Sequence, residues 1–254
     1  MTVLYVDVDG TLVGPGGILF WDGSTRVAES LVRAARAGIT VVPVTGRGRI
    51  QVFELCRLLG LRRGIAELGC VHVEGKEVRY ELGDFPFRGE TPVEAMLARG
   101  AVAAACNQLG LAPFEPWNEG RVATYLMRGA IDVEAGNAEL ARLGFGWCQL
   151  LDNGLAYHLA PAGTGKPAGV RADREHHGLA REDTAFVGDS VSDVACAAEV
   201  GRAWLVANAD PSITTNAFGH AAGGASGHAA GIERTKGRYG DGVAEVVDHL
   251  LGLI

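Results

Sequence analysis

The first ten residues constrain the fold more than any other part of the chain. Residues 3–6 (Val-Leu-Tyr-Val) form a short apolar run, and Asp7 and Asp9 follow it directly. An apolar run of this length without polar alternation is typical of a strand buried on both faces of a parallel sheet. In open α/β sheets, ligands bind beyond the carboxyl ends of the strands. The opening segment therefore predicts an α/β fold with its chemistry at Asp7 and Asp9.

Strands and helices alternate over the next sixty residues. Ser24 is placed to cap an amphipathic helix, and an apolar run over residues 39–44 predicts the next buried strand. A helix over residues 49–59 and a shorter strand near Ile65 repeat the pattern. Such β-α-β order predicts a parallel, Rossmann-like sheet with helices on both faces.

From about residue 71 the alternation pauses. A hairpin is expected over residues 71–80, and the capping box that begins at Thr91 opens an alanine-rich helix expected to end at Gly110. The further elements expected here are a strand over 122–127, a helix over 132–143, and strands over 147–151 and 155–159 joined by the tight turn Asp152-Asn153-Gly154. Helices combined with antiparallel strands predict a small inserted α+β unit.

The parallel pattern resumes with a helix after Lys166. Later elements are expected as a strand over 184–187, a helix over 191–200, a strand over 203–206 and a last helix over 242–251. We therefore predict a catalytic core made of residues 1–82 and 161–254, and an α+β cap domain made of residues 83–160.

A glycine-rich stretch of low complexity interrupts the second half of the core. Residues 217–231 predict a mobile loop before the last helix. His220 and His228 in this stretch are expected to be solvated rather than metal ligands, because no acid or cysteine is spaced to join them.

The amino-acid composition limits which cellular compartment and which binding partners are expected. The chain has 254 residues, of which 48% are hydrophobic, and a formal net charge of −7, which argues against nucleic acid or an anionic membrane as partner. Its five scattered cysteines form no CxxC pair, so neither a disulfide framework nor a zinc site is expected. No apolar stretch of about 18 residues and no secretion signal is present, so a cytoplasmic protein is expected.

The acid pair after the first strand has two interpretations. Because side chains alternate along a strand, Asp7 and Asp9 can face one site while Val8 points away. Carboxylate oxygens at a strand end suit Mg²⁺, which takes one or two carboxylates together with waters and a phosphate. The alternative is that the pair only ends a strand and caps a turn at Gly10, and an isolated D-x-D-G does not separate the two.

Phosphate-binding groups are expected at two other places. Thr45 and Gly46 follow the second strand and offer a hydroxyl and backbone N–H groups to an anion. Lys166, one of three lysines, lies in Gly-Thr-Gly-Lys-Pro, where a point charge would neutralise phosphate oxygens. A P-loop is excluded, because Pro167 follows the lysine and the preceding segment lacks the required spacing. The alternative for Lys166 is an ordinary surface lysine before a helix.

A second acid pair follows a later strand. In Gly-Asp-Ser-Val-Ser-Asp, Asp189 lies at the strand end and Asp193 lies one turn into a helix, so both can face the same crevice.

The ordered set DVDGT, TGR, a lone lysine and GDSVSD resembles the motifs of the haloacid dehalogenase (HAD) superfamily of phosphotransferases. The resemblance covers the whole chain, because the insert is similar to the α+β cap of C2B type in the Cof-type (IIB) subfamily. That subfamily includes sugar-phosphate, mannosyl-3-phosphoglycerate and sucrose-phosphate phosphatases. Two departures stand out: Ser192 where many relatives have asparagine, and Leu68 in Glu-Leu-Gly where many have Glu-Asn-Gly.

The resemblance implies a role for each motif residue. Asp7 would be the nucleophile and Asp9 the general acid and base, while Thr45, Gly46 and Lys166 would bind the phosphoryl group. The implied cofactor is Mg²⁺, held by Asp7, the Asp9 backbone carbonyl and Asp189, with Asp193 supporting the metal site.

The expected reaction is hydrolysis of a small phosphorylated metabolite, a sugar phosphate or phosphoglycerate derivative, through an aspartyl-phosphate intermediate. Arg47, Arg121, Tyr125 and His158 are candidate substrate contacts, although each of the three cap residues fits an ordinary sheet surface equally well. A phosphomutase of the same fold and a phospho-acceptor, receiver-like signalling module are the alternatives. The physiological substrate and the oligomeric state stay open.

Overall fold

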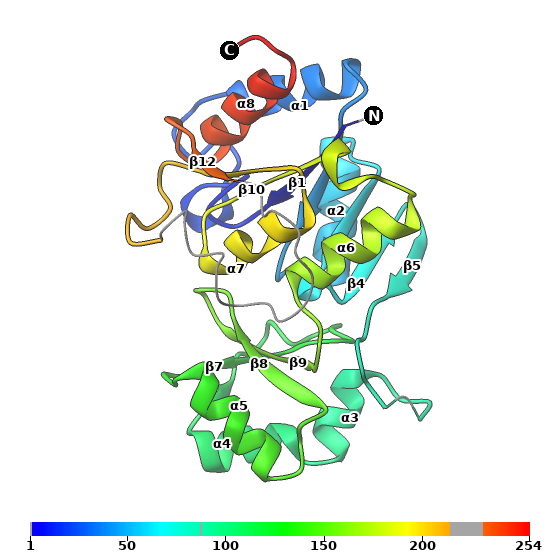
Figure 1. The fold of residues 1–254 in the computed structure, drawn as a ribbon. Helices are drawn as coiled ribbons and strands as arrows, with labels where there is room; N and C mark the ends of the chain where they lie inside the picture. Colours follow the sequence, from blue (N-terminus) through cyan, green and yellow to red (C-terminus); the bar gives the residue numbers. More distant parts are fainter. Residues whose placement is uncertain (1, 87, 214–230) are drawn as a thin grey trace.

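Two sheets organise the molecule, one in a core and one in a cap beneath it (Figure 1). The computed structural model describes residues 2–86, 88–213 and 231–254. Most of the predicted glycine-rich loop, with His220 and His228, lies outside the described residues. The two ends of the chain lie at the end of the core opposite the cap (Figure 1).

The core sheet has eight strands in the order β12-β11-β10-β1-β2-β3-β4-β5. Their bounds are β1 (Val3–Asp7), β2 (Thr40–Val44), β3 (Arg63–Ala66), β4 (Val71–Glu74), β5 (Glu77–Tyr80), β10 (Thr184–Gly188), β11 (Arg202–Leu205) and β12 (Ile232–Arg234). The strands from β12 to β3 are parallel, and the β4–β5 hairpin extends the sheet in antiparallel fashion. The predicted α/β class is confirmed.

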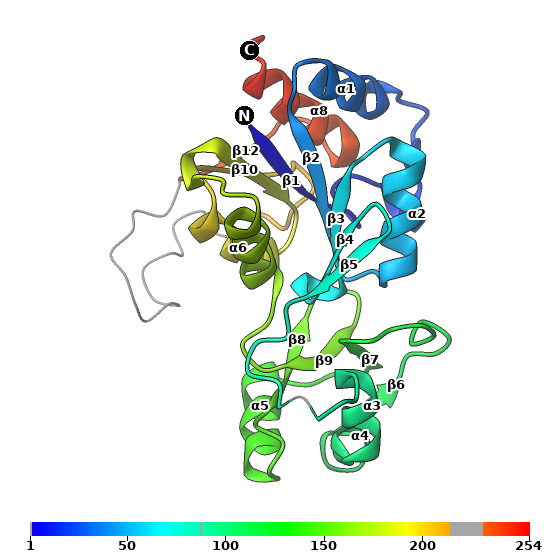
Figure 2. The ribbon, with the colours of Figure 1, turned by 90° about the vertical axis from the view of Figure 1, so that its right-hand side faces the viewer.

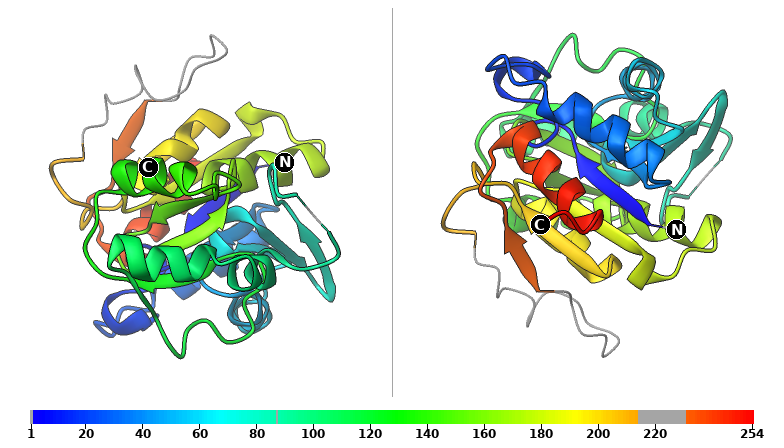
Figure 3. Two further views of the ribbon diagram at one scale, coloured as in Figure 1. Left: turned by 90° about the horizontal axis from the view of Figure 1, so that it is seen from below. Right: turned by 90° about the horizontal axis from the view of Figure 1, so that it is seen from above.

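Helices cover both faces of this sheet, as β-α-β order requires. One face carries α1 (Arg26–Arg36), α2 (Arg49–Leu59) and α8 (Tyr239–Leu250), and the other carries α6 (Lys166–His176), α7 (Val191–Val194) and the 3-10 helix η4 (Ala195–Glu199). Figure 2 shows α1 and α2 on one side and α6 on the other. Helices α1 and α8 pack side by side (Figure 3, right). Three further 3-10 turns are η1 (Pro15–Gly17), η2 (Glu67–Gly69) and η3 (Arg181–Asp183).

The cap is a four-stranded antiparallel sheet with three helices on its outer face (Figures 1 and 3). Its strands follow the order β6-β7-β9-β8. Their bounds are β6 (Ala112–Pro113), β7 (Tyr125–Arg128), β8 (Cys148–Asp152) and β9 (Tyr157–Pro161), and the helices are α3 (Pro92–Ala98), α4 (Ala101–Leu109) and α5 (Val133–Arg142). A separate apolar cluster between these helices and the sheet gives the cap its own core.

Three local predictions are wrong. The helix that Thr91 caps ends at Ala98 and a new one starts at Ala101, because Gly100 has a left-handed φ of 86°. Thr25, not Ser24, precedes α1, and the Ser24 hydroxyl binds Asp241. The turn at Asn153 is longer than predicted: Asp152 pairs with Tyr157, so four residues form the loop and Leu155 is exposed.

In the described part of the chain, no helix combines the length and the apolar character needed to cross a membrane.

Candidate active site

The predicted phosphotransfer residues meet at the carboxyl ends of β1, β2 and β10. Asp7 is the last residue of β1, which lies between β2 and β10. Thr45 follows β2, and Asp189 follows β10. Lys166 reaches the same place from the first position of α6. Parallel strands end at one edge of a sheet, so residues far apart in sequence come together there.

Lys166 joins two carboxylates at the centre of this cluster. Its Nζ donates to Asp7 Oδ1 at 2.6 Å and to Asp193 Oδ1 at 2.7 Å, and all three side chains are buried. Burial alone would lower the pKa of Lys166, but the Asp193 and Asp7 carboxylates outweigh it and raise that pKa. Lys166 is therefore a fixed positive charge, and its burial excludes the alternative of an ordinary surface lysine.

Close backbone contact sets the position of Lys166. A Cβ atom on Gly69 would lie 2.2 Å from the Gly165 carbonyl oxygen, and one on Gly169 would lie 2.5 Å from Gly69 Cα. Only glycine at both positions lets the first turn of α6 approach the turn η2 this closely.

The Asp193 carboxylate is occupied by hydrogen bonds from within the protein. Its Oδ2 accepts from the backbone N–H of Asp189 at 3.2 Å, and from the N–H and hydroxyl of Ser190 at 3.0 and 2.6 Å. These bonds, with the Lys166 contact, fix the loop that carries Asp189. Little acceptor capacity remains on Asp193 for a direct metal bond.

Asp7 and Asp189 retain free acceptor oxygens. Within the described residues, Asp7 Oδ2 and Asp189 Oδ2 receive no hydrogen bond, and Thr11 Oγ1 approaches Asp189 Oδ1 only at 3.4 Å. Burial raises the pKa of Asp7, with Lys166 opposing and the other two acids adding to the shift. Burial and Asp193 raise the pKa of Asp189 to about 6.

This donor set fits a hard divalent cation. Asp7, Asp189 and Asp193 place carboxylate oxygens within 4.8 Å of one another, and oxygen ligands are those Mg²⁺ prefers. Three acids against one lysine leave the cluster negative, and a bound cation would relieve this repulsion.

The loop after β1 is held tightly against Asp189. A Cβ atom on Gly10 would lie 2.1 Å from Asp189 Oδ2, so only glycine fits. Asn208 Nδ2 donates to the Gly10 carbonyl oxygen at 2.8 Å, and Asn208 Oδ1 accepts from the backbone N–H of Tyr239. Asn208 was not among the predicted site residues, because an isolated asparagine carries no pattern that points to a site.

Asp9 is not part of the three-acid group and pairs instead with Arg47. Arg47 Nε and Nη2 donate to its two carboxylate oxygens at 2.9 and 2.6 Å, a bidentate pair. The side chain of Asp9 is therefore held by an arginine from the segment that follows β2.

Thr45 and Gly46 lie at the edge of the core that faces the cap. Thr45 is buried, and its Oγ1 accepts from the Arg47 backbone N–H at 3.2 Å, which leaves the hydroxyl proton available to another acceptor. A Cβ atom on Gly46 would lie 2.7 Å from Asn153 Nδ2 and 3.1 Å from His158 Nε2. Two cap side chains thus press directly on the turn that follows β2.

The candidate cap residues differ in what they contact. His158 is buried, and its Nε2 has no hydrogen-bond partner within the described part of the chain, while its Nδ1 lies 3.3 Å from Thr124 Oγ1. Burial, with Arg121 and Lys166 nearby, holds the pKa of His158 well below its ordinary value, so the ring is neutral. Tyr125 belongs to the cap core, and its hydroxyl contacts Glu115.

Arg121 and Glu67 connect the cap to the core. Arg121 donates to Trp117 O, Thr124 Oγ1 and, at 2.7 Å, Gly46 O, so its donor groups are largely occupied. Glu67, fully buried in η2, accepts from the backbone N–H groups of Ala123 and Thr124, each at 2.9 Å. In the sequence, Glu-Leu-Gly stands out only as a departure from a motif, and nothing in it predicts this contact. The departure itself, Leu68, adopts a left-handed φ of 55° that asparagine tolerates better.

No protein-family model matches the chain. Solved structures share its architecture. A haloacid dehalogenase-like hydrolase from Bacteroides thetaiotaomicron has a TM-score of 0.70 and 19% identity, with 98% of this chain and 99% of that chain covered. The sucrose-phosphatase from Synechocystis, solved with sucrose and phosphate, has a TM-score of 0.70 and 18% identity over 98% of this chain and 97% of that chain. The fold is that of the HAD-like hydrolases.

A curated relative narrows the class. The phosphoglycolate phosphatase of Pyrobaculum neutrophilum is 33% identical over 98% of this chain and 95% of its own length. The chain therefore belongs to the phosphoglycolate phosphatase family within the HAD superfamily. It is a phosphoric monoester hydrolase for a small phosphorylated compound, and the predicted superfamily and enzyme class are confirmed.

Proposed function

We propose that this phosphatase hydrolyses a compact phosphorylated acid or sugar through an aspartyl phosphate formed on Asp7. The observation that carries the proposal is the position of Lys166 between Asp7 and Asp193, with free oxygens on Asp7 and Asp189 at the same strand ends. A nucleophile beside a fixed positive charge is the arrangement that phosphoryl transfer needs.

Mg²⁺ is the proposed cofactor, and Asp7, Asp189 and the backbone carbonyl of Asp9 would hold it, with Asp193 bracing the Asp189 loop. When bound, the cation would offset negative charge on the phosphoryl oxygens. Thr45, Gly46 and Lys166 would bind the same oxygens from the protein side.

The proposed reaction has two steps. An oxygen of Asp7 attacks phosphorus, the bond to the leaving oxygen breaks, and Asp9 supplies a proton to the leaving alcohol. Water then gives a proton to Asp9 and attacks the phosphoryl group, which releases inorganic phosphate and restores Asp7. For this step the Asp9 carboxyl group would leave Arg47 and contact the leaving oxygen. Arg47 would then be free to bind the substrate.

The cap supports a small leaving group. Asn153 and His158 lie against Gly46, and Arg121 donates to its carbonyl oxygen, so little space separates cap and core there. His158 Nε2 is a buried polar atom without a partner, suited to a polar group of the substrate. Several relatives are named phosphoglycolate phosphatase, and we propose phosphoglycolate and phosphoglycerate-type acids first, then sugar phosphates.

The test is a phosphate-release screen with phosphoglycolate, phosphoglycerate derivatives, sugar phosphates and nucleotides, run with Mg²⁺ and again with chelator. Asp7→Asn should lose at least about 1,000-fold in kcat while remaining folded, whereas the matched control Asp22→Asn, at an exposed position, should keep full activity. Wild-type turnover in Asp7→Asn would refute the mechanism. Isomerised product without phosphate release would indicate a mutase instead.

We propose that the enzyme acts in the cytoplasm. All five cysteines are free, and four of them are buried, as expected of thiols in a reducing compartment.

A further inference from the structure

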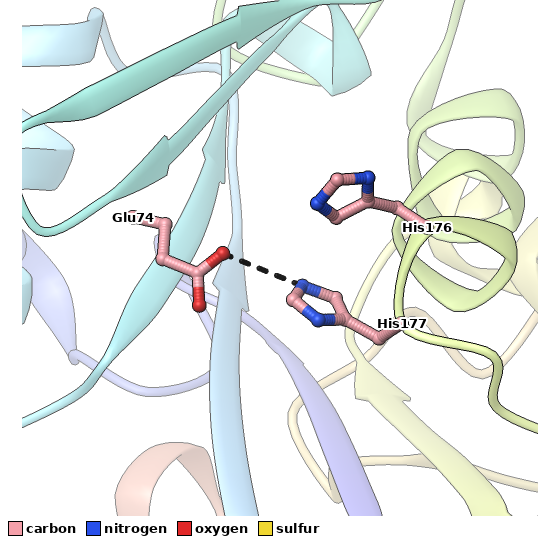
Figure 4. A group of neighbouring side chains, drawn as sticks. All are labelled: Glu74, His176 and His177. Atoms are coloured by element: carbon pink, nitrogen blue, oxygen red, sulfur yellow. Dashed lines mark ion pairs between the residues drawn. The ribbon is translucent and has the colours of Figure 1, made fainter.

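A second cluster of metal-ligand side chains lies at the other end of α6. Lys166 begins this helix and His176 ends it, so the helix length of about 15 Å separates the cluster from the phosphotransfer residues. Glu74 from the end of β4, His176 from the last position of α6 and His177 just after it point toward one another (Figure 4). This cluster lies between the core sheet and the helix, away from the cap.

We infer that Glu74, His176 and His177 form a binding site for a borderline divalent metal ion, with zinc as its representative. One ligand atom from each residue lies within 4.8 Å of the other two, and Glu74 Oε2 lies 3.6 Å from His177 Nε2. In a tetrahedral zinc site, bonds of about 2.0–2.2 Å place neighbouring ligand atoms about 3.3–3.6 Å apart. One pair is therefore already near this spacing.

Rotation of the side chains would bring the remaining ligand atoms closer together. His176 is exposed, and the Glu74 side chain is 48% exposed, so neither is locked by packing. Exposed side chains change rotamer readily, and ligand atoms that lie at most 4.8 Å apart would have to close by no more than about 1.5 Å to reach zinc spacing.

Carboxylates next to the cluster add negative charge, while Arg63 and Arg79 line the adjoining cavity. Glu77 lies directly opposite Glu74 across the β4–β5 hairpin, and like charges at this position repel each other. Asp173 Oδ1 lies 3.5 Å from His177 Nε2, although Arg63 neutralises much of that carboxylate. A metal ion would relieve the repulsion between the two glutamates.

A cavity of about 110 Å³ adjoins the cluster and supplies room for a water ligand. His176, Glu74 and Glu77 line it together with His72, which is only 6% exposed. Among the described residues His72 Nε2 is buried without a hydrogen-bond partner, whereas its Nδ1 lies 3.3 Å from Arg79 Nη2.

The ligand types separate this site from the phosphotransfer centre. Imidazole nitrogen suits Zn²⁺, Ni²⁺ or Cu²⁺, whereas Mg²⁺ prefers oxygen alone. An ion bound here would cross-link the end of α6 to β4 and would therefore stabilise the folded chain. The inference does not depend on the proposed substrate or on the aspartyl phosphate.

The experiment is calorimetric titration of the full chain with Zn²⁺ at pH 8, with Mg²⁺ at saturating concentration to occupy the oxygen site. We expect one zinc ion per chain and a rise in Tm of about 3 °C. His176→Ala/His177→Ala should weaken this binding at least about tenfold and abolish the rise in Tm, and Glu74→Gln should weaken it too. Co²⁺ in place of Zn²⁺ should give visible absorption in the wild type and not in the double variant.

His220→Ala/His228→Ala is the matched control, because it removes the same number of histidines and should leave zinc binding unchanged. Equal zinc binding by the wild type and the His176/His177 variant, or no zinc binding by the wild type, would overturn the inference. All variants should keep Mg²⁺-dependent phosphate release, which verifies their folding separately.

Discussion

Two clusters of charged side chains in the core differ in the balance between negative and positive charge. At the strand ends, Asp7, Asp189 and Asp193 share one lysine. The second cluster, on the α6 side of the sheet, is centred on one acid, Asp173. It accepts hydrogen bonds from Arg63 Nε and Nη2, each at 3.1 Å, and from the Tyr5 hydroxyl at 2.8 Å.

The pKa values move in opposite directions in the two clusters. Burial would raise the pKa of Asp173, but hydrogen bonds from its neighbours and the charge of Arg63 outweigh burial and hold that pKa well below its ordinary value. At the strand ends burial and neighbouring acids prevail, and the pKa of Asp189 rises to about 6. A buried carboxylate with all its donors stabilises the fold, whereas carboxylates with free oxygens are costly until a cation or substrate arrives.

Of the changes that compare the two clusters, the largest expected effect comes from removing the lysine that contacts Asp7 and Asp193. Lys166→Met should lower kcat at least about 100-fold, because the phosphoryl oxygens lose a charged partner and Asp7 and Asp193 then repel each other. Phosphate release under saturating Mg²⁺ measures the effect. The control Lys76→Met changes an exposed lysine at the hairpin turn and should retain full activity. A Lys166→Met enzyme with normal kcat would show that the charge excess has no catalytic importance.

In the cluster of Asp173, Arg63 and Tyr5, where the charges are balanced, a substitution should lower stability rather than turnover. Asp173→Asn leaves buried Arg63 without its counterion and should lower the free energy of unfolding by about 3–5 kcal/mol. Urea denaturation measures the loss, and kcat of the folded fraction should stay within about twofold of wild type. A large fall in kcat with unchanged stability would reverse the roles assigned to the two clusters.

Acid should weaken the balanced cluster first. A carboxyl group whose pKa is lowered in the folded state contributes stability above its unfolded pKa of about 3.9, and that stability is lost as pH falls toward the folded pKa. The free energy of unfolding of the wild type should therefore fall more steeply between pH 5 and pH 3 than that of Asp173→Asn. Parallel curves, from denaturation at each pH, would contradict the assignment.

The smallest expected effect has the opposite sign. Without Mg²⁺, Asp189→Asn should raise the free energy of unfolding by about 0.5–1.5 kcal/mol, because it removes one of three crowded negative charges. Added Mg²⁺ should raise the Tm of the wild type and not that of the variant. Destabilisation of the metal-free variant would mean that Asp189 is already satisfied by the protein.

Much of the site was predictable because strand ends combine two strong local patterns. An apolar run followed by acids, as at Asp7 and Asp189, marks both the strand and the polar edge where the strand ends. The contacts that hold the cap were not predictable, since Glu67 binds backbone N–H groups more than fifty residues away. Asp173 was missed for the same reason: in sequence it is one of several charged residues on a helix.

By itself, the order of apolar runs, helices and acids determined the α/β class, and it predicted the inserted unit and the strand ends proposed to carry the chemistry. These features depend on periodicity and on backbone preferences, which act over a few residues. Only the tertiary structure decided which oxygens stay free, which arginine holds Asp9 and where the two histidines after α6 meet Glu74. Charge balance in a buried cluster depends on distances between segments remote in sequence, and no local pattern encodes those distances.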